Sequence, residues 1–138
     1  MPETTTTSRA AANIEAVKRG YEAFQTGNLD LLRNELFAPD IVWHSPGRNP
    51  LSGDYRGADD VIGLFVKQFE LTDGTVKVEL HDVLSSDDHA VALGTFSAER
   101  NGKSIKEPYA HVFHITDGRV TESWIVDYDP YKGDEFFA

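Results

Sequence analysis

Two histidines and an aspartate are the side chains of this sequence best suited to proton-transfer chemistry. His111 lies in a run of β-forming residues, Asp127 ends the next such run, and His44 lies near the end of a shorter one. An imidazole titrates near neutral pH, and a carboxylate in apolar surroundings has a raised pKa and becomes a usable base. Together these groups could remove a proton next to a carbonyl group or activate a water molecule.

The same residues also fit a structural role, and that alternative stays open. His111 could be a hydrogen-bonded cross-strand partner of Ser123, and Asp127 could end its strand by binding a loop. His44 lies where the chain enters residues 46–57, which hold two prolines and three glycines. Long irregular segments in compact domains are more often functional than accidental, which favours a role for His44 at a site.

Several other chemistries lack the residues that they need. The chain has no cysteine, which excludes disulfide scaffolds, thiolate metal sites and cysteine nucleophiles. His111 and His114 point to opposite faces of one strand, and neither Glu-x-x-His nor His-x-Glu occurs, so we expect no metal site. Glycine-rich phosphate loops and the Gly-x-Ser-x-Gly elbow are also absent. We therefore expect no cofactor, and chemistry that rests on His, Asp, Glu and Tyr.

Length and charge narrow the setting of this chemistry. The 138 residues fit one domain, which we expect over residues 9–138 after a frayed tail at residues 1–8. Thirteen basic against 23 acidic residues give a net charge of −10, so nucleic-acid and membrane partners are not expected. No apolar run approaches the roughly 20 residues that span a bilayer, and residues 1–8 do not read as a targeting signal. We expect a soluble, cytoplasmic protein.

The hydrophobic pattern predicts helices in the first half and strands in the second. Apolar residues recur at three- and four-residue steps in three segments, residues 9–26, 29–36 and 59–71, with a short strand at 41–45. Four runs rich in β-branched and aromatic residues follow, at 75–84, 89–100, 103–115 and 119–127. This order predicts an α+β fold in which three helices pack on a curved, mostly antiparallel sheet.

Four stretches between residues 14 and 129 follow one recognisable pattern. They read Tyr21-Glu-Ala-Phe-Gln-Thr-Gly-Asn-Leu-Asp, Phe37-Ala-Pro-Asp-Ile-Val-Trp-His-Ser-Pro-Gly, Tyr55-Arg-Gly-Ala-Asp-Asp-Val-Ile and His111-Val-Phe-His-Ile-Thr-Asp-Gly-Arg-Val. The pattern resembles the SnoaL-like branch of the NTF2-like superfamily, which holds ketosteroid isomerase-like and polyketide cyclase-like proteins. The resemblance implies a cone-shaped barrel, a deep pocket between the concave sheet and the helices, and commonly a homodimer through the sheet. The superfamily includes cyclases, isomerases, epoxide hydrolases, dehydratases and binding modules, so fold alone does not decide the function.

The sequence departs from the motifs of the enzymes that it resembles. The ketosteroid isomerases place a tyrosine in the first helix and an aspartate before the first-strand proline, where this chain has Gly20 and Ser45. The epoxide hydrolases bridge two aspartates with an arginine, for which this chain offers only Arg100 and Asp127. The cyclases place an acid shortly after a tryptophan of the last strand, and Trp124 followed by Asp127 is similar but differently spaced.

The last hairpin decides which side chains face the implied pocket. A three-residue turn at Thr116-Asp117-Gly118 pairs Phe113 with Thr121 and His111 with Ser123, whereas a two-residue turn shifts every partner by one. We favour the three-residue turn because superfamily members resemble it and because it leaves an apolar back face for a partner subunit, formed by Val112, Val120, Trp124 and Val126. The concave face then carries Tyr109, His111, Phe113, Ser123, Ile125 and Asp127.

We therefore expect a cofactor-free enzyme of the SnoaL-like type that isomerises, cyclises or hydrates a small apolar carbonyl-bearing metabolite. The catalytic candidates are His111, Asp127 and His44, and the alternative is a non-catalytic ligand-binding or dimerisation module. The residues expected to line the pocket are Tyr21, Phe24, Val42, Phe65, Tyr109, Phe113, Ser123 and Ile125. The Phe136-Phe137 pair could plug the pocket mouth or form a surface patch.

Overall fold

The structure is a computed structural model that describes residues 2–138, with side chains from Arg9 onward. Residues 1–8, for which a frayed tail is predicted, lie outside the part whose side chains are described. Helix α1 (Pro2–Thr26) ends before Gly27, whose φ of +77° suits a residue without a side chain. Asn28 then caps the short α2 (Leu29–Leu31) by accepting a 3.3 Å hydrogen bond from the Leu31 N–H group, and a π-helical segment, η1 (Leu32–Leu36), follows.

The region predicted as one short strand and a long loop is a β-hairpin. Strand β1 (Phe37–Ser45) begins four residues before the predicted start and pairs with β2 (Gly53–Arg56), which lies inside the predicted loop. The Gly57 N–H group donates a 2.7 Å hydrogen bond to the Ile41 carbonyl oxygen, which directs the chain into α3 (Ala58–Leu71). The irregular part of the loop is therefore short, and both of its ends are fixed by the sheet.

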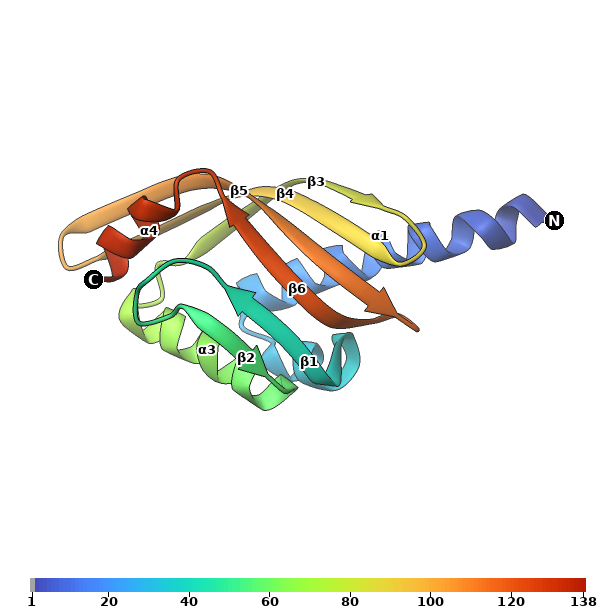
Figure 1. Cartoon of the computed structure of the whole chain (residues 1–138), viewed down its shortest axis with the longest axis horizontal. Coiled ribbons are helices and arrows are strands. Elements are labelled where there is room, and N and C mark those ends of the chain that lie inside the picture. The colour runs from blue at the N-terminus through green and yellow to red at the C-terminus, as the bar shows by residue number, and fades with distance from the viewer. Residues whose placement is uncertain (1) are drawn as a thin grey trace.

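The four predicted strands of the second half form one sheet with β1 and β2 (Figure 1). They are β3 (Lys77–Ser85), β4 (His89–Arg100), β5 (Lys103–Thr116) and β6 (Arg119–Asp127). The strand order is β2-β1-β6-β5-β4-β3, and every neighbouring pair is antiparallel except β1 and β6. The predicted α+β fold with a mostly antiparallel sheet is thus confirmed, with a fourth helix, α4 (Pro130–Phe137), that the sequence pattern did not predict.

The register of the last hairpin differs from the favoured prediction, although most residues lie on the predicted faces. Asp117 and Gly118 form a two-residue turn with φ values of 51° and 77° that pairs Thr116 with Arg119. A bulge at Thr121 then adds one residue to β6, so Phe113 pairs with Ser123 instead of Thr121. Turn and bulge together shift the pairing of β5 with β6 by two residues relative to the prediction, so the predicted concave face is kept after the bulge. Between the turn and the bulge the pairing is shifted by only one residue, which exchanges the two faces of β6. Val120, predicted on the back face, therefore lines the interior.

The core lies between the concave face of the sheet and the helices. Helix α1 packs along β3 and β4, and α3 packs beside β1 and β2 (Figure 1). Aromatic rings from these elements meet in the interior, where Phe65 of α3 lies 5.1 Å from both Phe24 and Trp43 between ring centroids. The opposite face of the sheet leaves apolar side chains exposed, among them Leu84, Leu93, Trp124 and Val126.

Candidate functional site

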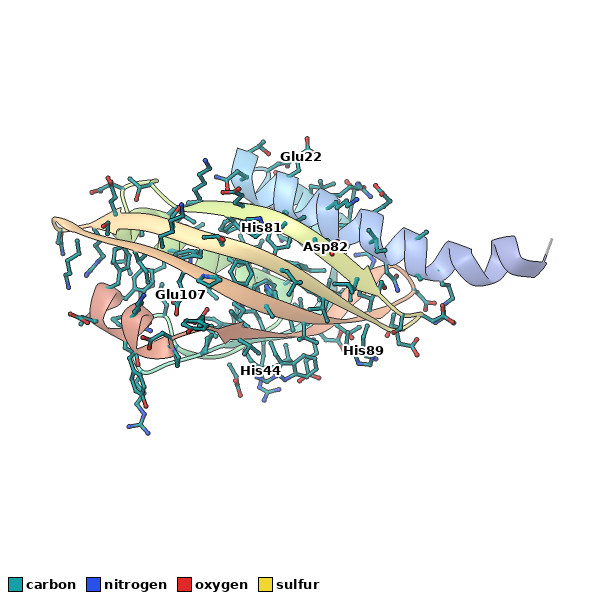
Figure 2. All side chains as sticks on the ribbon, turned by 90° about the horizontal axis from the view of Figure 1, so that it is seen from above. Glu22, His44, His81, Asp82, His89 and Glu107 are labelled. Carbon is teal, nitrogen blue, oxygen red and sulfur yellow. The ribbon has the colours of Figure 1, made fainter. Side chains whose placement is uncertain are left out.

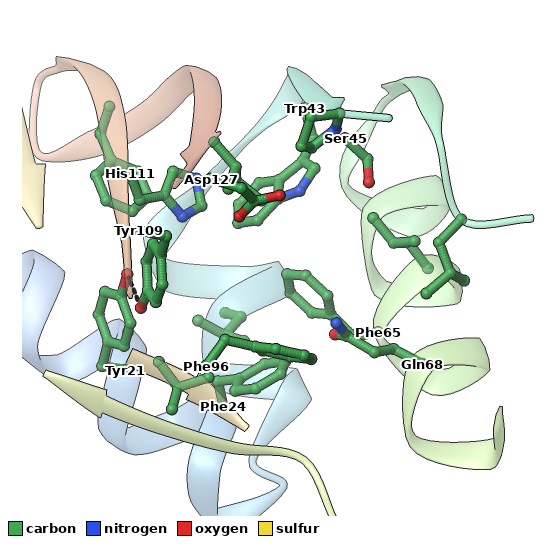
Figure 3. A pocket seen from close by; sticks show the side chains of 18 of the residues that line it. Tyr21, Phe24, Trp43, Ser45, Phe65, Gln68, Phe96, Tyr109, His111 and Asp127 are labelled. Atoms are coloured by element: carbon green, nitrogen blue, oxygen red, sulfur yellow. Dashed lines mark hydrogen bonds between the residues drawn. The ribbon is translucent and has the colours of Figure 1, made fainter. Parts of the chain in front are cut away.

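A cavity of about 190 Å³ lies between the concave sheet and helices α1, α3 and α4 (Figure 3). Its wall is mostly aromatic and aliphatic, with rings from Phe24, Phe37, Trp43, Phe65, Phe96, Phe113 and Phe137. The polar residues on the wall are Tyr21, Ser45, Asn49, Gln68, Glu107, Tyr109, His111 and Asp127. The cavity is larger than the roughly 150 Å³ apolar cavity that holds a benzene molecule, so it has room for a one-ring ligand.

Asp127 is the last residue of β6, and its carboxyl group reaches the cavity wall (Figure 3). Burial, with smaller contributions from the nearby carboxyls of Glu107 and Asp134, raises the pKa of Asp127 to about 6. Within the described residues, no hydrogen bond reaches its carboxyl oxygens. A carboxyl with these properties can take up and release a proton near neutral pH.

Glu107 is a buried acid that the sequence interpretation did not select for the site. Its residue is only 3% exposed, and its carboxyl accepts a hydrogen bond from the backbone N–H of Asp129. Burial raises the pKa of Glu107, although the Asp129 N–H group partly opposes the shift. The signal for it was present, because strand alternation puts residues 107, 109 and 111 of β5 on one face.

His111 is buried at the cavity wall against two aromatic rings and carries an unpaired ring nitrogen. The ring stacks on Phe113 at 4.1 Å and meets the edge of Trp43 at 4.7 Å. Burial lowers the pKa of His111 to about 3, so the imidazole is neutral at neutral pH. Within the described part of the chain, Nε2 has no hydrogen-bond partner, and Ser123 Oγ has none either. The structural alternative, a hydrogen bond between these two side chains, is therefore wrong, because Ser123 pairs with Phe113.

Tyr21 and Tyr109 bring two hydroxyl groups together at the cavity wall. Their oxygens lie 2.9 Å apart and share a hydrogen bond (Figure 3). Burial raises the pKa of Tyr109 to about 12 and that of Tyr21 further, so both phenols keep their protons at neutral pH. Two hydroxyls carry two protons and the shared bond uses one. The other is available to a ligand oxygen.

Gly94 of β4 leaves room for this tyrosine pair. A Cβ atom at this position would lie 2.7 Å from the Glu79 carbonyl oxygen and 2.9 Å from the Tyr109 hydroxyl oxygen. We expect Gly94→Ala to lower the free energy of unfolding by about 1–3 kcal/mol, as overpacking usually does, measured by urea denaturation. Gly63→Ala is the matched control, because Gly63 lies exposed in α3 with no neighbouring atom, and alanine should stabilise that helix by about 0.5–1 kcal/mol. Equal stability of Gly94→Ala and the wild type would contradict the close packing.

Three residues expected at the cavity lie elsewhere, which corrects the prediction. Trp43 and Ser45 line the cavity, so alternation along β1 turns Val42 and His44 to the other face. Figure 2 shows His44 on the side of the strands opposite α1. Ser123 faces inward but is 0% exposed and lies behind the wall. The other predicted lining residues, Tyr21, Phe24, Phe65, Tyr109, Phe113 and Ile125, are placed on the wall together with His111 and Asp127.

His44 belongs to a small polar cluster on the outer face of the sheet. Its Nδ1 lies 2.7 Å from Oδ1 of Asp54, its Nε2 lies 2.7 Å from Oε2 of Glu122, and its ring stacks on Trp124. The hydrogen bonds to Glu122 and Asp54 raise the pKa of His44. His44 is therefore held in place by two carboxylates and does not reach the cavity.

Helix α4 closes one end of the cavity. Phe136 and Phe137 are both buried, and Phe137 lines the wall, so the pair is a plug and not a surface patch. Arg100 and Lys103 donate hydrogen bonds of 3.0–3.3 Å to carbonyl oxygens at the end of α4. At the start of the helix, Asp129 caps it by accepting a hydrogen bond from the Tyr131 N–H group. Interactions from the β4–β5 hairpin thus hold this cover in place.

The α4 cover is also tied to the loop after β1. Asp134 accepts hydrogen bonds from the Arg48 N–H group at 2.6 Å and from Asn49 Nδ2 at 2.9 Å. These bonds lower the pKa of Asp134. Gly47 is required here, because its φ is +91° and a Cβ atom would lie 2.4 Å from Asp134 Oδ1. Loop and helix therefore form one cover over the cavity.

Among the side chains described from Arg9 onward, no three or more His, Asp or Glu residues gather in a way that could hold a metal ion. Over residues 2–138, no helix combines the length and the apolar character needed to cross a bilayer.

Comparison with known proteins places this chain in a family. The sequence profile of the SnoaL-like domain matches residues 17–123. The chain belongs to the SnoaL-like family. The protein Bal32a, from a soil-derived mobile gene cassette, has a similar solved structure that is 37% identical and covers 94% of this chain and 99% of its own, with a TM-score of 0.91.

Further relatives of this SnoaL-like chain extend the similarity. A Xanthomonas campestris protein of unknown function with a cystatin-like fold is 29% identical over 91% of this chain and 98% of its own, with a TM-score of 0.85. An uncharacterised protein of Mycobacterium tuberculosis (strain H37Rv) is 34% identical over 128 residues, which cover 92% of this chain and 97% of the relative. An NTF2-like protein of unknown function from Burkholderia pseudomallei, 24% identical over 92% of this chain and 98% of its own, has the same fold with a TM-score of 0.76. Together these similarities confirm the SnoaL-like family and the NTF2-like fold.

Proposed function

We propose that this SnoaL-like protein is a cofactor-free enzyme that isomerises, cyclises or hydrates a small apolar carbonyl compound by acid/base chemistry. The observation that carries the proposal is Asp127, whose carboxyl lies at the wall of an aromatic cavity and has its pKa raised to about 6. Such a carboxyl is mostly ionised at neutral pH and yet is a stronger base than an ordinary aspartate. This combination suits removal of a proton from carbon.

The reaction begins with proton transfer from the ligand to Asp127. The carboxylate takes a proton from the carbon next to the carbonyl group, the C–H electron pair forms a carbon–carbon double bond, and the carbonyl π electrons move to oxygen. The free O–H of the Tyr21–Tyr109 pair donates a hydrogen bond to that enolate oxygen. Where the ligand is a β,γ-unsaturated ketone, this enolate is conjugated with the second carbon–carbon double bond. Asp127 then returns the proton to the γ-carbon, the double bond moves next to the carbonyl group, and the isomerisation is complete without loss of any atom.

His111 supplies a second hydrogen-bonding group to the ligand. Its lowered pKa keeps the ring uncharged, so it acts through the unpaired Nε2 and not as a cation. A ligand oxygen or hydroxyl group would satisfy this buried atom, whose lack of a partner costs the protein about 1–3 kcal/mol. The cavity wall thus offers a base, a hydroxyl donor and an imidazole around one ring-sized space.

Deuterium exchange tests the proposed chemistry without knowledge of the natural substrate. We expect the protein to exchange the α-protons of neutral one-ring ketones, such as cyclohex-2-enone, in D₂O faster than buffer does, measured by proton NMR. Binding of the same ketones is followed by the fluorescence of Trp43, which lies in the cavity wall. Saturable binding with no exchange for any ketone would contradict the enzyme and support the alternative, a non-catalytic ligand-binding module.

We also propose that two copies pair through the outer face of the sheet. The exposed apolar residues of this face support the pairing, since Leu84 is 54% exposed, Trp124 36% and Val126 58%. Sedimentation equilibrium tests it, with a mass of twice 15.3 kDa expected. A single 15.3 kDa species at micromolar concentration would contradict the homodimer.

A further inference from the structure

The ionisable groups on the cavity wall that can carry a charge at neutral pH are acidic. Glu107 and Asp127 bring two carboxyls to the wall, and none of the described residues that line it is a lysine or an arginine. His111 does not balance them, because burial keeps its ring neutral. The cavity therefore holds up to two negative charges with no positive charge on its wall.

Glu107 is held where it can act on a ligand. It projects from the same face of β5 as Tyr109 and His111, and the Asp129 N–H group fixes one of its carboxyl oxygens. Its residue is 3% exposed, so solvent screens its charge little. The second observation that points to a ligand is His111, which lines the same wall, is 5% exposed and has a buried Nε2 without a partner within the described residues.

Charges on the neighbouring elements do not offset the negative charge of Glu107 and Asp127. Asp134 of α4 adds to the negative field at Asp127, and Asp129 adds to it at Glu107. Tyr109 of β5 stays protonated and uncharged. Lys132 of α4 is the cation that acts on Glu107. Its effect is the smallest of the four influences on the pKa of Glu107, and its side chain is not part of the cavity wall.

We propose that Glu107 is a specificity-determining residue that, together with Asp127, rejects ligands bearing a carboxylate or a phosphate, so that the substrate is an uncharged one-ring carbonyl compound. This inference rests on the proposed function for the carbonyl group. An anion within a few ångströms of two ionised carboxyls is repelled strongly in a partly buried site. A cationic ligand would lower the pKa of Asp127 and weaken it as a base, whereas a neutral ligand leaves the base unchanged.

Glu107 also adjusts the base. Its charge is one of the causes that raise the pKa of Asp127, so removing that charge should let the pKa of Asp127 fall from about 6 toward its ordinary value. Glu107 therefore has two measurable effects, discrimination against anions and the pH at which Asp127 titrates. A residue with only a structural role would change neither.

Two probes of equal size, benzamide and benzoate, test the inference by isothermal titration calorimetry at pH 8. We expect wild-type protein to bind benzamide at least tenfold more tightly than benzoate, because only benzoate is charged. Glu107→Gln should reduce this ratio by about tenfold and move the Asp127 titration to lower pH, followed by NMR. The matched control is Glu99→Gln, which removes the same charge from an exposed site on β4 and should leave both readouts unchanged.

The wild-type protein provides a measurement that does not depend on the folding of any variant. A free carboxyl titrates at roughly pH 4, so benzoate stays ionised between pH 8 and pH 5, whereas Asp127 gains its proton over this range. Benzoate binding should therefore tighten at least threefold at pH 5, while benzamide binding changes little.

Three results would overturn the inference. They are equal binding of both probes by the wild type, an unchanged ratio in folded Glu107→Gln, and failure of benzamide to bind at all, which would exclude a one-ring ligand. None of these results depends on turnover. If benzoate binds well and ketones still exchange deuterium, the charge selection fails and the proposed function stands. If benzamide is preferred and no ketone exchanges deuterium, the charge selection stands and the proposed function fails.

Discussion

The variant Asp127→Asn is expected to lower kcat/KM for deuterium exchange about 100-fold or more while ligand binding stays within about threefold of the wild type. Asparagine has nearly the same shape as aspartate but cannot take up the proton. In the wild type, the rate should rise with pH through about pH 6 and then level off, because the base must be ionised to act. The residual rate of Asp127→Asn should lose this pH dependence.

Loss of folding should not account for the loss of rate. The raised pKa of Asp127 means that its ionised form costs the folded state free energy above the pKa of the unfolded chain, so neutral asparagine should keep or raise the melting temperature at pH 7. Asp40→Asn is the matched control, because Asp40 is exposed on β1, outside the cavity, and the variant should exchange deuterium at the wild-type rate. Unchanged exchange in Asp127→Asn would refute its role as the base.

The variant Phe65→Ala is expected to have the largest effect on stability. Phe65 is 5% exposed, and its ring meets Phe24 and Trp43 edge-on at 5.1 Å and lies 6.1 Å from Phe37. Removing it takes away the centre of this cluster and leaves a hole in the wall between α3 and the sheet. We expect the free energy of unfolding to fall by about 3–5 kcal/mol, measured by urea denaturation.

The neighbouring residue provides the control for Phe65. Val66 lies in the same helix but is 41% exposed, so Val66→Ala should change the free energy of unfolding by no more than about 0.5 kcal/mol. A loss of less than about 1 kcal/mol in Phe65→Ala would mean that the neighbouring rings collapse into the space. In that case the aromatic wall would be more adaptable than its packing indicates.

Local patterns predicted most of the elements because those elements follow a simple period. The three-residue and four-residue steps around Phe24 and Phe65 marked the inward faces of α1 and α3, and Asp117-Gly118 marked the last hairpin. The register of that hairpin could not be read from the turn alone, because it also depends on the bulge at Thr121. The predicted faces of β6 were nevertheless correct over residues 123–127, because the one-residue shifts from the turn and from the bulge add up to two and restore the alternation.

The candidate site was less predictable because its composition depends on contacts between distant segments. His44 was expected at the cavity, but alternation along β1 fixes only which residues share a face, and the face that points inward is that of Trp43 and Ser45. Helix α4 escaped prediction because it is short and carries a glycine, and its position depends on Arg100 and on residues 47–49. Glu107 was not selected because a glutamate in a strand usually faces water; alternation puts it on the face of Tyr109 and His111, but only the fold shows that this end of the strand is enclosed.

The placement of α4 directly after Asp127 links the cover of the cavity to the strength of its base. The helix begins three residues after this aspartate, and Asp134 and Phe137 of the same helix act on the carboxyl and on the cavity wall. Burial is the largest cause of the raised pKa of Asp127, and Asp134 adds to it. The hydrogen bonds that hold α4 to the β4–β5 hairpin and to residues 48–49 therefore also help to keep Asp127 a stronger base than a free aspartate.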